Sequence, residues 1–269
     1  MARTPDVVTT APSLGRTVVL SVMPVSIAWQ DARVERGRVE EAGATGSRVV
    51  ARADDGIAEL ALLRRRTPDG DVLELVVDGV FAMDTEQTET ERALATLALE
   101  QLGGDGLHVV VGGLGLGYTT ATLLADERVR RVDVVELHAP LVQWVREGLV
   151  PAMHGVLDDP RVRVTVADIV DAVPELPPAS VDMLLLDVDN GPGFLVHPGN
   201  TRVYAAPFLT AAARALRSGG VLGVWSAESS AELALVLERT CGACEEVLLD
   251  VVRDGRTFTY AVYLARVGR

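Results

Sequence analysis

The sequence predicts an α/β fold, in which a doubly wound, mostly parallel sheet of seven strands follows a small N-terminal β domain. The first observation is an alternation that begins near residue 107, where short runs rich in Val and Leu are separated by segments with helical spacing. Nearly continuous apolar runs are typical of strands that helices cover on both faces. The second observation is that residues 17–87 consist of strand-like segments joined by turn residues.

The N-terminal region is expected to be a β-hairpin domain. Residues 1–16 are polar, and we expect them to form a flexible N-terminus, so that the β domain spans 17–87. Two strand-like segments flank the sequence TPDG, whose Pro68 and Gly70 predict a turn. The sequence VDGV at 77–80 predicts a second tight turn.

The larger domain spans 88–269 and begins with a helix over 88–102, which has an acidic first turn and closes at Gly103. The strands expected after it cover 107–113, 131–137, 161–168, 181–189, 219–227 and 245–252, and the helices between them cover 118–125, 139–147, 204–216 and 230–240. A last alternating segment, 257–266, is expected to return as an antiparallel strand at the edge of the sheet. In a sheet of this kind the ligand lies beyond the carboxyl ends of the strands.

Composition restricts the class of partner. The net charge is −13, and no basic stripe is available to neutralise phosphates, so nucleic-acid binding is not expected. The apolar run at 17–29 is shorter than the roughly 20 residues that a membrane-spanning helix needs, and Pro24 interrupts it. We therefore expect a cytoplasmic protein with no membrane partner.

No metal site is expected. The two cysteines, Cys241 and Cys244, form a CxxC sequence, but the four histidines are scattered singly and supply no further ligands. The pair follows a helical segment, whereas reactive CxxC cysteines lie at helix N-termini, where the dipole stabilises a thiolate. Two incidental thiols at a turn are the favoured interpretation.

A glycine-rich loop, GGLGLG at 112–117, connects the first strand of the large domain to a helix. Glycines at such a turn let a ligand approach the backbone and face the free N–H groups of the helix. Dinucleotide-binding folds use the spacing G-x-G-x-x-G. Here the spacing is G-x-G-x-G, at Gly113, Gly115 and Gly117, which is the form seen in folds that bind S-adenosylmethionine.

Acidic residues end the next three strands. Glu136 lies nineteen positions after Gly117, where a carboxylate can accept hydrogen bonds from both ribose hydroxyls. Asp168 ends the third strand, where the adenine amino group would lie, and Asp187 ends the fourth. Three acidic strand ends beside a glycine loop predict a pocket for an adenosyl ligand.

These segments resemble the spermidine synthase family, which has a class I methyltransferase-like fold, over residues 57–265. The matching segments are LELVVDGVFAMDT, VVVGGLGLG, VVEL, DDPRVRVTVAD, LLLDVDNGP and LTAAARALRSGGVLGVWSAE. The resemblance implies a small N-terminal β domain that helps to cover the active site. It also implies a small-molecule acceptor and a homodimer or larger homo-oligomer.

Site residues follow from the resemblance by position. The loop Gly112, Gly113, Gly115 and Gly117 would line a sulfonium nucleoside, Glu136 with Leu137 would hold its ribose, and Asp168 with Ile169 would meet its adenine. Asp187 would lie beside the sulfonium, where polyamine enzymes use an aspartate to orient and deprotonate the attacking amine.

The sequence departs from the family pattern at several positions. Aminopropyltransferases usually have the loop G-G-G-D-G-G, and Gly115 takes the place of its aspartate, which helps to hold the ammonium of the decarboxylated donor. Their D-S-S-D-P sequence is replaced here by 187–192, so that Asn190 stands in place of the second acid. A Gln that often follows the second turn is replaced at 82–83, and the usual Tyr and His are absent from the helix that begins near residue 88.

The departure at Gly115 favours methyl transfer from S-adenosylmethionine, because an acid at this position would repel the carboxylate of the intact donor. Two alternatives remain: aminopropyl transfer from decarboxylated S-adenosylmethionine, and binding of an adenosyl ligand without turnover. No metal cofactor is expected in any of them.

Asp187 is the expected catalytic residue, positioning and deprotonating a small acceptor such as an amine. Asp189 is the second catalytic candidate, and for both acids a role in the turn is the alternative. Asn190, His197 and Tyr204 are candidates for lining the acceptor site, and for His197 and Tyr204 the alternative is a structural role.

Overall fold

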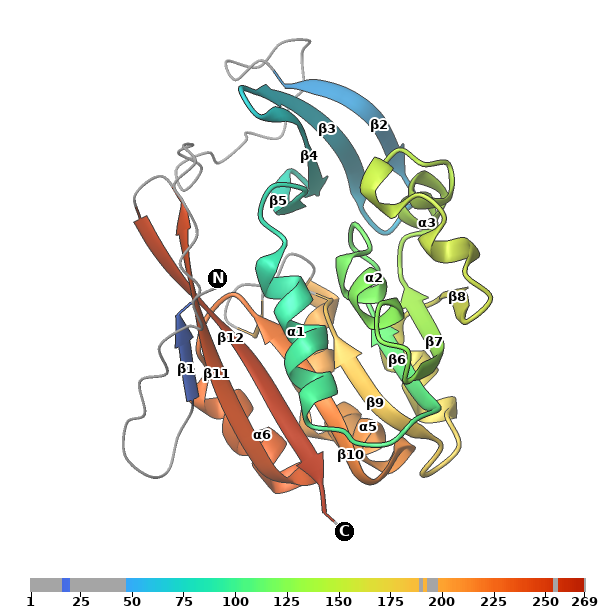
Figure 1. Ribbon diagram of the computed structural model, residues 1–269, viewed down its shortest axis with the longest axis vertical. Helices are drawn as coiled ribbons and strands as arrows, with labels where there is room; N and C mark the ends of the chain where they lie inside the picture. The colour runs from blue at the N-terminus through green and yellow to red at the C-terminus, as the bar shows by residue number, and fades with distance from the viewer. Residues whose placement is uncertain (1–15, 20–46, 189–190, 193–197, 254–255, 269) are drawn as a thin grey trace.

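The computed structural model describes residues 16–19, 47–188, 191–192, 198–253 and 256–268. They form an eight-stranded sheet with helices on both faces and a separate sheet of four strands (Figure 1). The predicted fold class, a mostly parallel doubly wound sheet with a small N-terminal β domain, is confirmed. No helix of the described residues is long and apolar enough to span a membrane.

The large sheet has the strand order β1-β11-β12-β10-β9-β6-β7-β8. Its strands are β1 (Arg16–Val19), β6 (Leu107–Gly112), β7 (Val129–Glu136), β8 (Val162–Val166), β9 (Val181–Leu186), β10 (Leu216–Ser226), β11 (Gly242–Arg253) and β12 (Arg256–Val267). The strands from β10 to β8 pair in parallel, whereas β12 is antiparallel to both of its neighbours. The predicted seven strands correspond to β6 to β12.

Two details of the sheet differ from the prediction. The last strand, β12, does not lie at the edge but between β10 and β11, and its residues 261–265 are all buried. The alternating pattern that indicated an edge strand is confined to the preceding residues, 256–260, where burial alternates. The strand β1 pairs in parallel with β11 of the large sheet, although residues 17–19 were assigned to the small domain.

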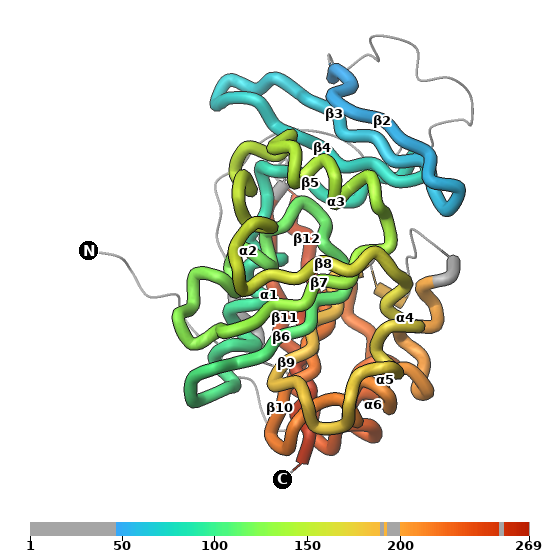
Figure 2. The backbone as a smooth tube through the Cα atoms, turned by 90° about the vertical axis from the view of Figure 1, so that its right-hand side faces the viewer, coloured from blue at the N-terminus to red at the C-terminus, as the bar shows by residue number. Residues whose placement is uncertain are grey.

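Six helices accompany the large sheet: α1 (Glu89–Glu100), α2 (Tyr118–Leu124), α3 (Ala139–Arg146), α4 (Ile169–Ala172), α5 (Ala206–Ala215) and α6 (Ala231–Cys241). Successive side chains of a strand point to opposite faces, so Val109 and Val111 of β6 pack with α1, α2 and α3, whereas Val110 packs with α4, α5 and α6. Figure 2 shows the sheet from its edge, with α1 on one side and α4, α5 and α6 on the other.

The small sheet is an antiparallel meander of β2 (Arg48–Asp54), β3 (Glu59–Thr67), β4 (Gly70–Val77) and β5 (Val80–Asp84). Asp78 and Gly79 both have positive φ at the predicted second turn, which suits a two-residue hairpin loop. Leu60, Leu62 and Leu75 belong to the same apolar core as the helices α1 and α2. The small sheet therefore packs on the large domain, beyond the carboxyl ends of β6 and β7 (Figures 1 and 2).

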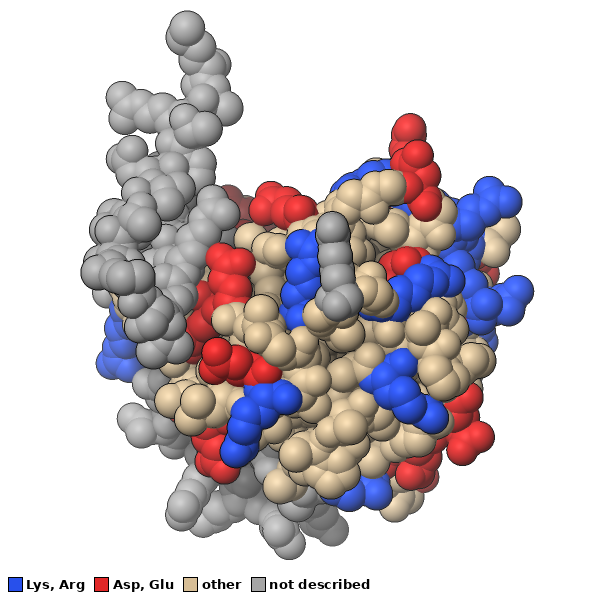
Figure 3. All heavy atoms as spheres, turned by 90° about the horizontal axis from the view of Figure 1, so that it is seen from below, with Lys and Arg blue, Asp and Glu red and all other residues tan. Residues whose placement is uncertain are grey.

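The opposite end of the molecule carries charges of both signs. Seen from below, acidic side chains and basic side chains, all of them Arg, lie interspersed among uncharged residues (Figure 3). This face shows no continuous basic stripe over the part of the chain that is described there (Figure 3).

Candidate active site

A cavity lies at the carboxyl edge of the parallel strands, under the small sheet. It is lined by seven of the predicted residues: Gly113, Gly115, Glu136, Leu137, Asp168, Ile169 and Asp187. They come from the ends of β6, β7, β8 and β9, which lie side by side in the sheet although they are far apart in the sequence. The parallel register therefore brings the predicted nucleoside residues together.

The glycine loop is shaped by close packing. A Cβ atom at Gly113 would lie 2.0 Å from the carbonyl oxygen of Asp187, so only glycine allows the ends of β6 and β9 to approach this closely. Gly117 has a φ of 96° and precedes α2 as its N-cap residue. Gly112 packs against the Ile169 side chain. Gly112 and Gly117 do not line the cavity, unlike Gly113 and Gly115.

Glu136 connects β7 to the glycine loop. Its side chain is 4% exposed, Oε2 accepts a 2.6 Å hydrogen bond from the Leu114 N–H, and Oε1 accepts a 2.8 Å bond from the His138 N–H. Burial raises the pKa of the Glu136 carboxyl, and the two backbone N–H groups oppose this shift because they stabilise the charged form. Each oxygen keeps a further lone pair that a ligand hydroxyl can use.

Asp168 is committed to structural contacts at the other side of the cavity. Its Oδ1 accepts a 2.9 Å bond from the Val170 N–H and thereby caps α4, while Oδ2 pairs with Arg202 at 2.7 Å. Ile169 follows directly and lines the cavity with it. Asp168 thus serves as a helix N-cap residue as well as a wall of the cavity.

Asp187 follows the last residue of β9, and its backbone N–H donates to the Gly112 carbonyl at 2.9 Å. The side chain is partly accessible and lines the cavity, and its Oδ2 accepts a 2.7 Å bond from the Thr119 hydroxyl. Removal from bulk water raises the pKa of Asp187 to about 6; the charge of Glu136 adds to this, and the Thr119 bond opposes it. This carboxylate can accept a proton near neutral pH.

Of the remaining predicted residues, three lie outside the described part of the chain and one lies in the core. Asp189, Asn190 and His197 lie outside the described residues. Tyr204 is 8% exposed and lies in the core beside Phe208, not in the cavity wall. Its packing favours the structural alternative for Tyr204.

Both cysteines are held as thiols by their folded surroundings. Burial raises the pKa of Cys241 to about 11 and that of Cys244 to about 12, so both remain thiols at neutral pH. Among the residues that the structure describes, no group of three or more His, Cys, Asp or Glu side chains is arranged to hold a metal ion.

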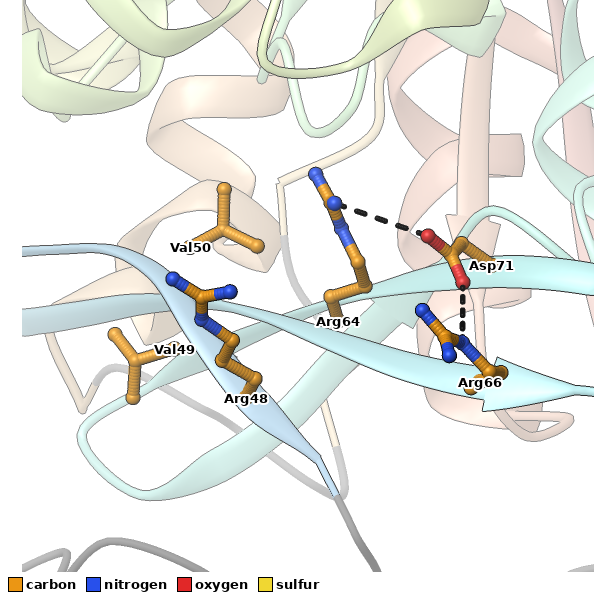
Figure 4. Close-up of a pocket in the computed structure, with 6 residues that line it drawn as sticks. All are labelled: Arg48, Val49, Val50, Arg64, Arg66 and Asp71. Atoms are coloured by element: carbon orange, nitrogen blue, oxygen red, sulfur yellow. Dashed lines mark ion pairs between the residues drawn. The ribbon is translucent and has the colours of Figure 1, made fainter.

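A second hollow lies on the small sheet and differs in character. It is lined by Arg48, Val49, Val50, Arg64, Arg66 and Asp71 (Figure 4). Asp71 lies 3.7 Å from Arg64 and 3.6 Å from Arg66, and the Arg66 side chain is 88% exposed. Ion pairs this long and this exposed contribute little to stability. None of the predicted site residues borders this hollow.

Comparisons with known proteins agree with the geometry. No family model matches the chain. The polyamine aminopropyltransferase of Mycobacterium tuberculosis is 28% identical over 178 residues, which are 65% of this chain and 32% of that protein. Spermidine synthase 1 of Hyoscyamus niger is 27% identical over 175 residues, 64% of this chain and 53% of that protein.

A solved spermidine synthase in complex with the transition state analogue AdoDATO has the same fold. The two structures superpose with a TM-score of 0.68 at 17% sequence identity. The superposition covers 82% of this chain and 74% of the chain of the solved enzyme. The chain is similar to members of the spermidine synthase family at 27–28% identity, and it shares the fold of a solved member. The matched segment spans between a third and about half of the length of the two curated relatives described above.

One departure from the spermidine synthase pattern has a structural counterpart. At Gly115, which stands in place of the family aspartate, an added Cβ would lie 2.7 Å from Sδ of Met83. The same sulfur accepts a 3.2 Å hydrogen bond from the Leu116 N–H. The β5 strand of the small sheet therefore fills the space beside the glycine loop with a thioether in place of a carboxylate.

Several residues that line the cavity were not predicted. They are Met83 of β5, Glu91 of α1, His138 before α3, Asn200, and Trp225 of β10. Thr119 of α2, which was not predicted either, does not line the cavity but donates a hydrogen bond to Asp187. These residues lie outside the DVDNGP segment and the glycine loop, from which the site was predicted. Each is on an element that comes next to the cavity only when the chain folds, so no local pattern indicated its place there. Trp225 follows the apolar run of β10, a pattern that indicates a packing residue.

His138 links the small sheet to the cavity wall. Its Nδ1 lies 2.9 Å from Oδ2 of Asp55, in the turn between β2 and β3. Although burial acts to raise the pKa of Asp55, hydrogen bonds from Ala58, His138 and Ile57 bring it below its ordinary value. This contact holds the turn between β2 and β3 of the small sheet against the cavity wall.

Proposed function

We propose that the chain is an aminopropyltransferase that uses decarboxylated S-adenosylmethionine as its donor and an amine as its acceptor. The observation that carries this proposal is the charge of the cavity wall. Four carboxylates line it, those of Glu91, Glu136, Asp168 and Asp187. Arg202 pairs with Asp168 from outside the lining, and no Arg is among the described lining residues. A donor tail that ends in an ammonium suits such a wall, and a tail that also bears a carboxylate does not.

The same charge argument weighs against methyl transfer, which the glycine at position 115 favours when the sequence is considered alone. The intact donor would bring its carboxylate into a cavity where Glu91 and Asp187 remain, even though position 115 carries no acid. The names of the curated relatives, polyamine aminopropyltransferase and spermidine synthase, point to the same alternative.

In the proposed reaction the nucleoside binds between the glycine loop and α4. Glu136 with Leu137 would accept the ribose hydroxyls, and Asp168 with Ile169 would meet the adenine. These contacts anchor the part of the donor that does not react, and they place the sulfonium near Asp187. Holding both reactants in this way supplies much of the rate enhancement of a displacement reaction.

The chemical step is an in-line displacement. The neutral nitrogen of the acceptor attacks the aminopropyl carbon that is bonded to the sulfonium; the C–S bond breaks, and its electron pair returns to sulfur, which leaves as the thioether of methylthioadenosine. The nitrogen loses a proton to the carboxylate of Asp187. With a pKa of about 6, this group is mostly deprotonated at neutral pH and ready to accept it.

Product analysis tests this function. The protein is incubated with 1,4-diaminobutane and either decarboxylated or intact S-adenosylmethionine, and the nucleoside products are separated by chromatography. Methylthioadenosine formed from the decarboxylated donor supports the proposal. S-adenosylhomocysteine formed from the intact donor would instead establish a methyltransferase. Donor binding measured by calorimetry without either product would indicate a binding protein that does not turn over.

A further inference from the structure

The small sheet carries three arginines on one of its faces. Successive side chains of a strand point to opposite faces, so Arg64 and Arg66 of β3 share a face, and the buried Arg65 points away from it. Arg48 of β2 lies directly opposite Arg64 in the ladder, and Asp71 of β4 lies opposite Arg66. Residues that are paired in this way point to the same face of a sheet. The register of three strands therefore gathers three guanidinium groups and one carboxylate (Figure 4).

These four side chains surround a hollow of about 450 Å³ together with Val49 and Val50, and we call it the arginine hollow. Its volume is within the range of ligand-binding pockets, roughly 300–1,000 Å³. It shares no lining residue with the cavity at the carboxyl edge of the parallel strands. The arginine hollow is therefore a separate candidate site, and an inference about its ligand does not depend on the proposed aminopropyl transfer.

The charges of the arginines are neutralised incompletely. The Asp71 carboxylate lies 3.7 Å from Arg64 and 3.6 Å from Arg66, and both distances exceed the roughly 2.7–3.2 Å of a hydrogen bond. Arg48 forms no ion pair with a residue that the structure describes. Three positive charges and one negative charge leave a net charge of +2 among the described residues that line the hollow, although the whole chain has a net charge of −13.

The opposition of Arg48 and Arg64 favours an anionic ligand. Like charges that lie directly opposite each other on neighbouring strands destabilise a sheet. An anion bound between two guanidinium groups offsets this repulsion, because each group then faces an opposite charge. A guanidinium also presents its N–H donors as a planar fork, which matches the oxygens of a phosphate or a carboxylate.

We propose that the arginine hollow binds a phosphate group, either as inorganic phosphate or as part of a small phosphate monoester. A phosphate monoester carries a charge of about −1.5 to −2 at pH 7, which matches the net charge of the hollow, whereas a single carboxylate would neutralise half of it. Val49 and Val50 offer an apolar wall to the organic part of a monoester, and Val49 is 41% exposed. A compact group of three arginines does not form the extended basic track that binds a nucleic-acid backbone.

Calorimetric titration at low ionic strength tests the site, with inorganic phosphate, phenyl phosphate and acetate as probes. Arg48→Gln is compared with Arg52→Gln, because both arginines are exposed on β2 and lose the same charge, but Arg52 does not line the hollow. We expect R48Q to raise the Kd of both phosphates by about fivefold, the upper range for an exposed ion pair, and R52Q to leave it within about twofold. Asp71→Asn removes the competing carboxylate and should lower the Kd by about fivefold.

Two results distinguish the sources of the phosphate group, and both support the site: tighter binding of phenyl phosphate indicates an organic monoester, and equal binding of the two indicates inorganic phosphate. Four results would overturn the inference. They are a wild-type chain that binds neither phosphate, acetate bound as tightly as phosphate, an unchanged Kd in R48Q, and equal losses in R48Q and R52Q. Matching thermal unfolding of the wild type and the three variants verifies that all are folded. The titrations need no turnover, so a failure of the proposed transferase activity leaves their result unaffected.

Discussion

The Thr119 hydroxyl donates a 2.7 Å hydrogen bond to Oδ2 of Asp187, and this contact joins the first turn of α2 to the end of β9. The bond stabilises the charged form of a carboxyl group whose pKa the surroundings raise to about 6. Thr119 therefore acts on the proposed base without lining the cavity itself, and it belongs to the positioning residues of the site.

Removal of this bond is expected to shift the pH profile. In the wild-type chain, kcat should rise with pH through about 6, because Asp187 must lose its proton to act as a base. In Thr119→Val the charged form loses a donor, so the pKa rises and the acid limb of kcat moves up by about one pH unit. Thr119→Ser keeps the hydroxyl and serves as the control. Superimposable profiles for T119V and the wild type would contradict the proposed role.

Substitution of Asp187 separates catalysis from donor binding. Asp187→Asn keeps an oxygen that can accept from Thr119, but it removes the base, so kcat should fall by about 10²- to 10⁴-fold. Calorimetry should give a donor Kd close to that of the wild type, because the ribose and adenine contacts are untouched. A large loss of donor affinity with kcat preserved would show that Asp187 binds the donor and does not act on the acceptor.

The same variant has a predicted effect on stability. The Asp187 carboxyl holds its proton more tightly in the folded chain than in the unfolded chain, so its contribution to the free energy of unfolding falls as the pH rises from 3.8 to about 6. The Asn side chain of D187N does not titrate, so the variant does not lose stability over this pH range. Its free energy of unfolding at pH 7 should exceed that of the wild type by roughly 1–2 kcal/mol, and by less at pH 4. Urea unfolding at both pH values measures it, and a variant less stable at pH 7 would contradict it.

The contact between Met83 and the glycine loop predicts a paired effect. Gly115→Asp places a Cβ atom 2.7 Å from Sδ of Met83, so the single variant should unfold at lower temperature and bind the donor more weakly. In the double variant G115D/M83A the clash is absent, and the new carboxylate should strengthen binding of the decarboxylated donor by about tenfold relative to M83A. Equal donor affinities in M83A and the double variant would show that position 115 does not face the donor ammonium.

Gly113 is expected to tolerate no side chain. In Gly113→Ala the Cβ atom would lie 2.0 Å from the Asp187 carbonyl oxygen, at a φ of 88°, so the free energy of unfolding should fall by about 2–5 kcal/mol. Gly104→Ala is the matched control, because Gly104 has a similar φ of 82° but no atom within 4 Å of an added Cβ. Its loss should be about 1 kcal/mol, from backbone strain alone. Equal losses in urea unfolding would contradict the close approach of β6 and β9.

Much of the large domain was predictable because each element has a local signal. The apolar runs of β6, β7, β8, β9 and β10 are continuous in the sequence, and the helices between them have a period that the sequence displays directly. The position of β12 was predicted wrongly, because its exposed first half alternates like an edge strand, whereas its second half is buried between β10 and β11. Pairing partners are a property of the sheet, and no local pattern in the strand specifies them.

The sequence by itself determined which strand ends meet at the candidate site. Gly113, Glu136, Asp168 and Asp187 each stand at a strand end, and parallel strands in one sheet bring their carboxyl ends to a common edge. Spacing along the chain was therefore sufficient to predict that these residues line one cavity.

Only the tertiary structure decided which further residues line the cavity and how far the pKa of Asp187 is raised. Met83, Glu91 and Trp225 come from a small sheet, a helix face and a strand that meet at the cavity through packing, and their local sequence resembles that of ordinary core segments. The raised pKa of Asp187 likewise depends on removal from water and on the nearby charge of Glu136. Removal from water and the interaction between two charges both depend on distance in space. Residues that are far apart in the chain therefore raise this pKa together once the chain has folded.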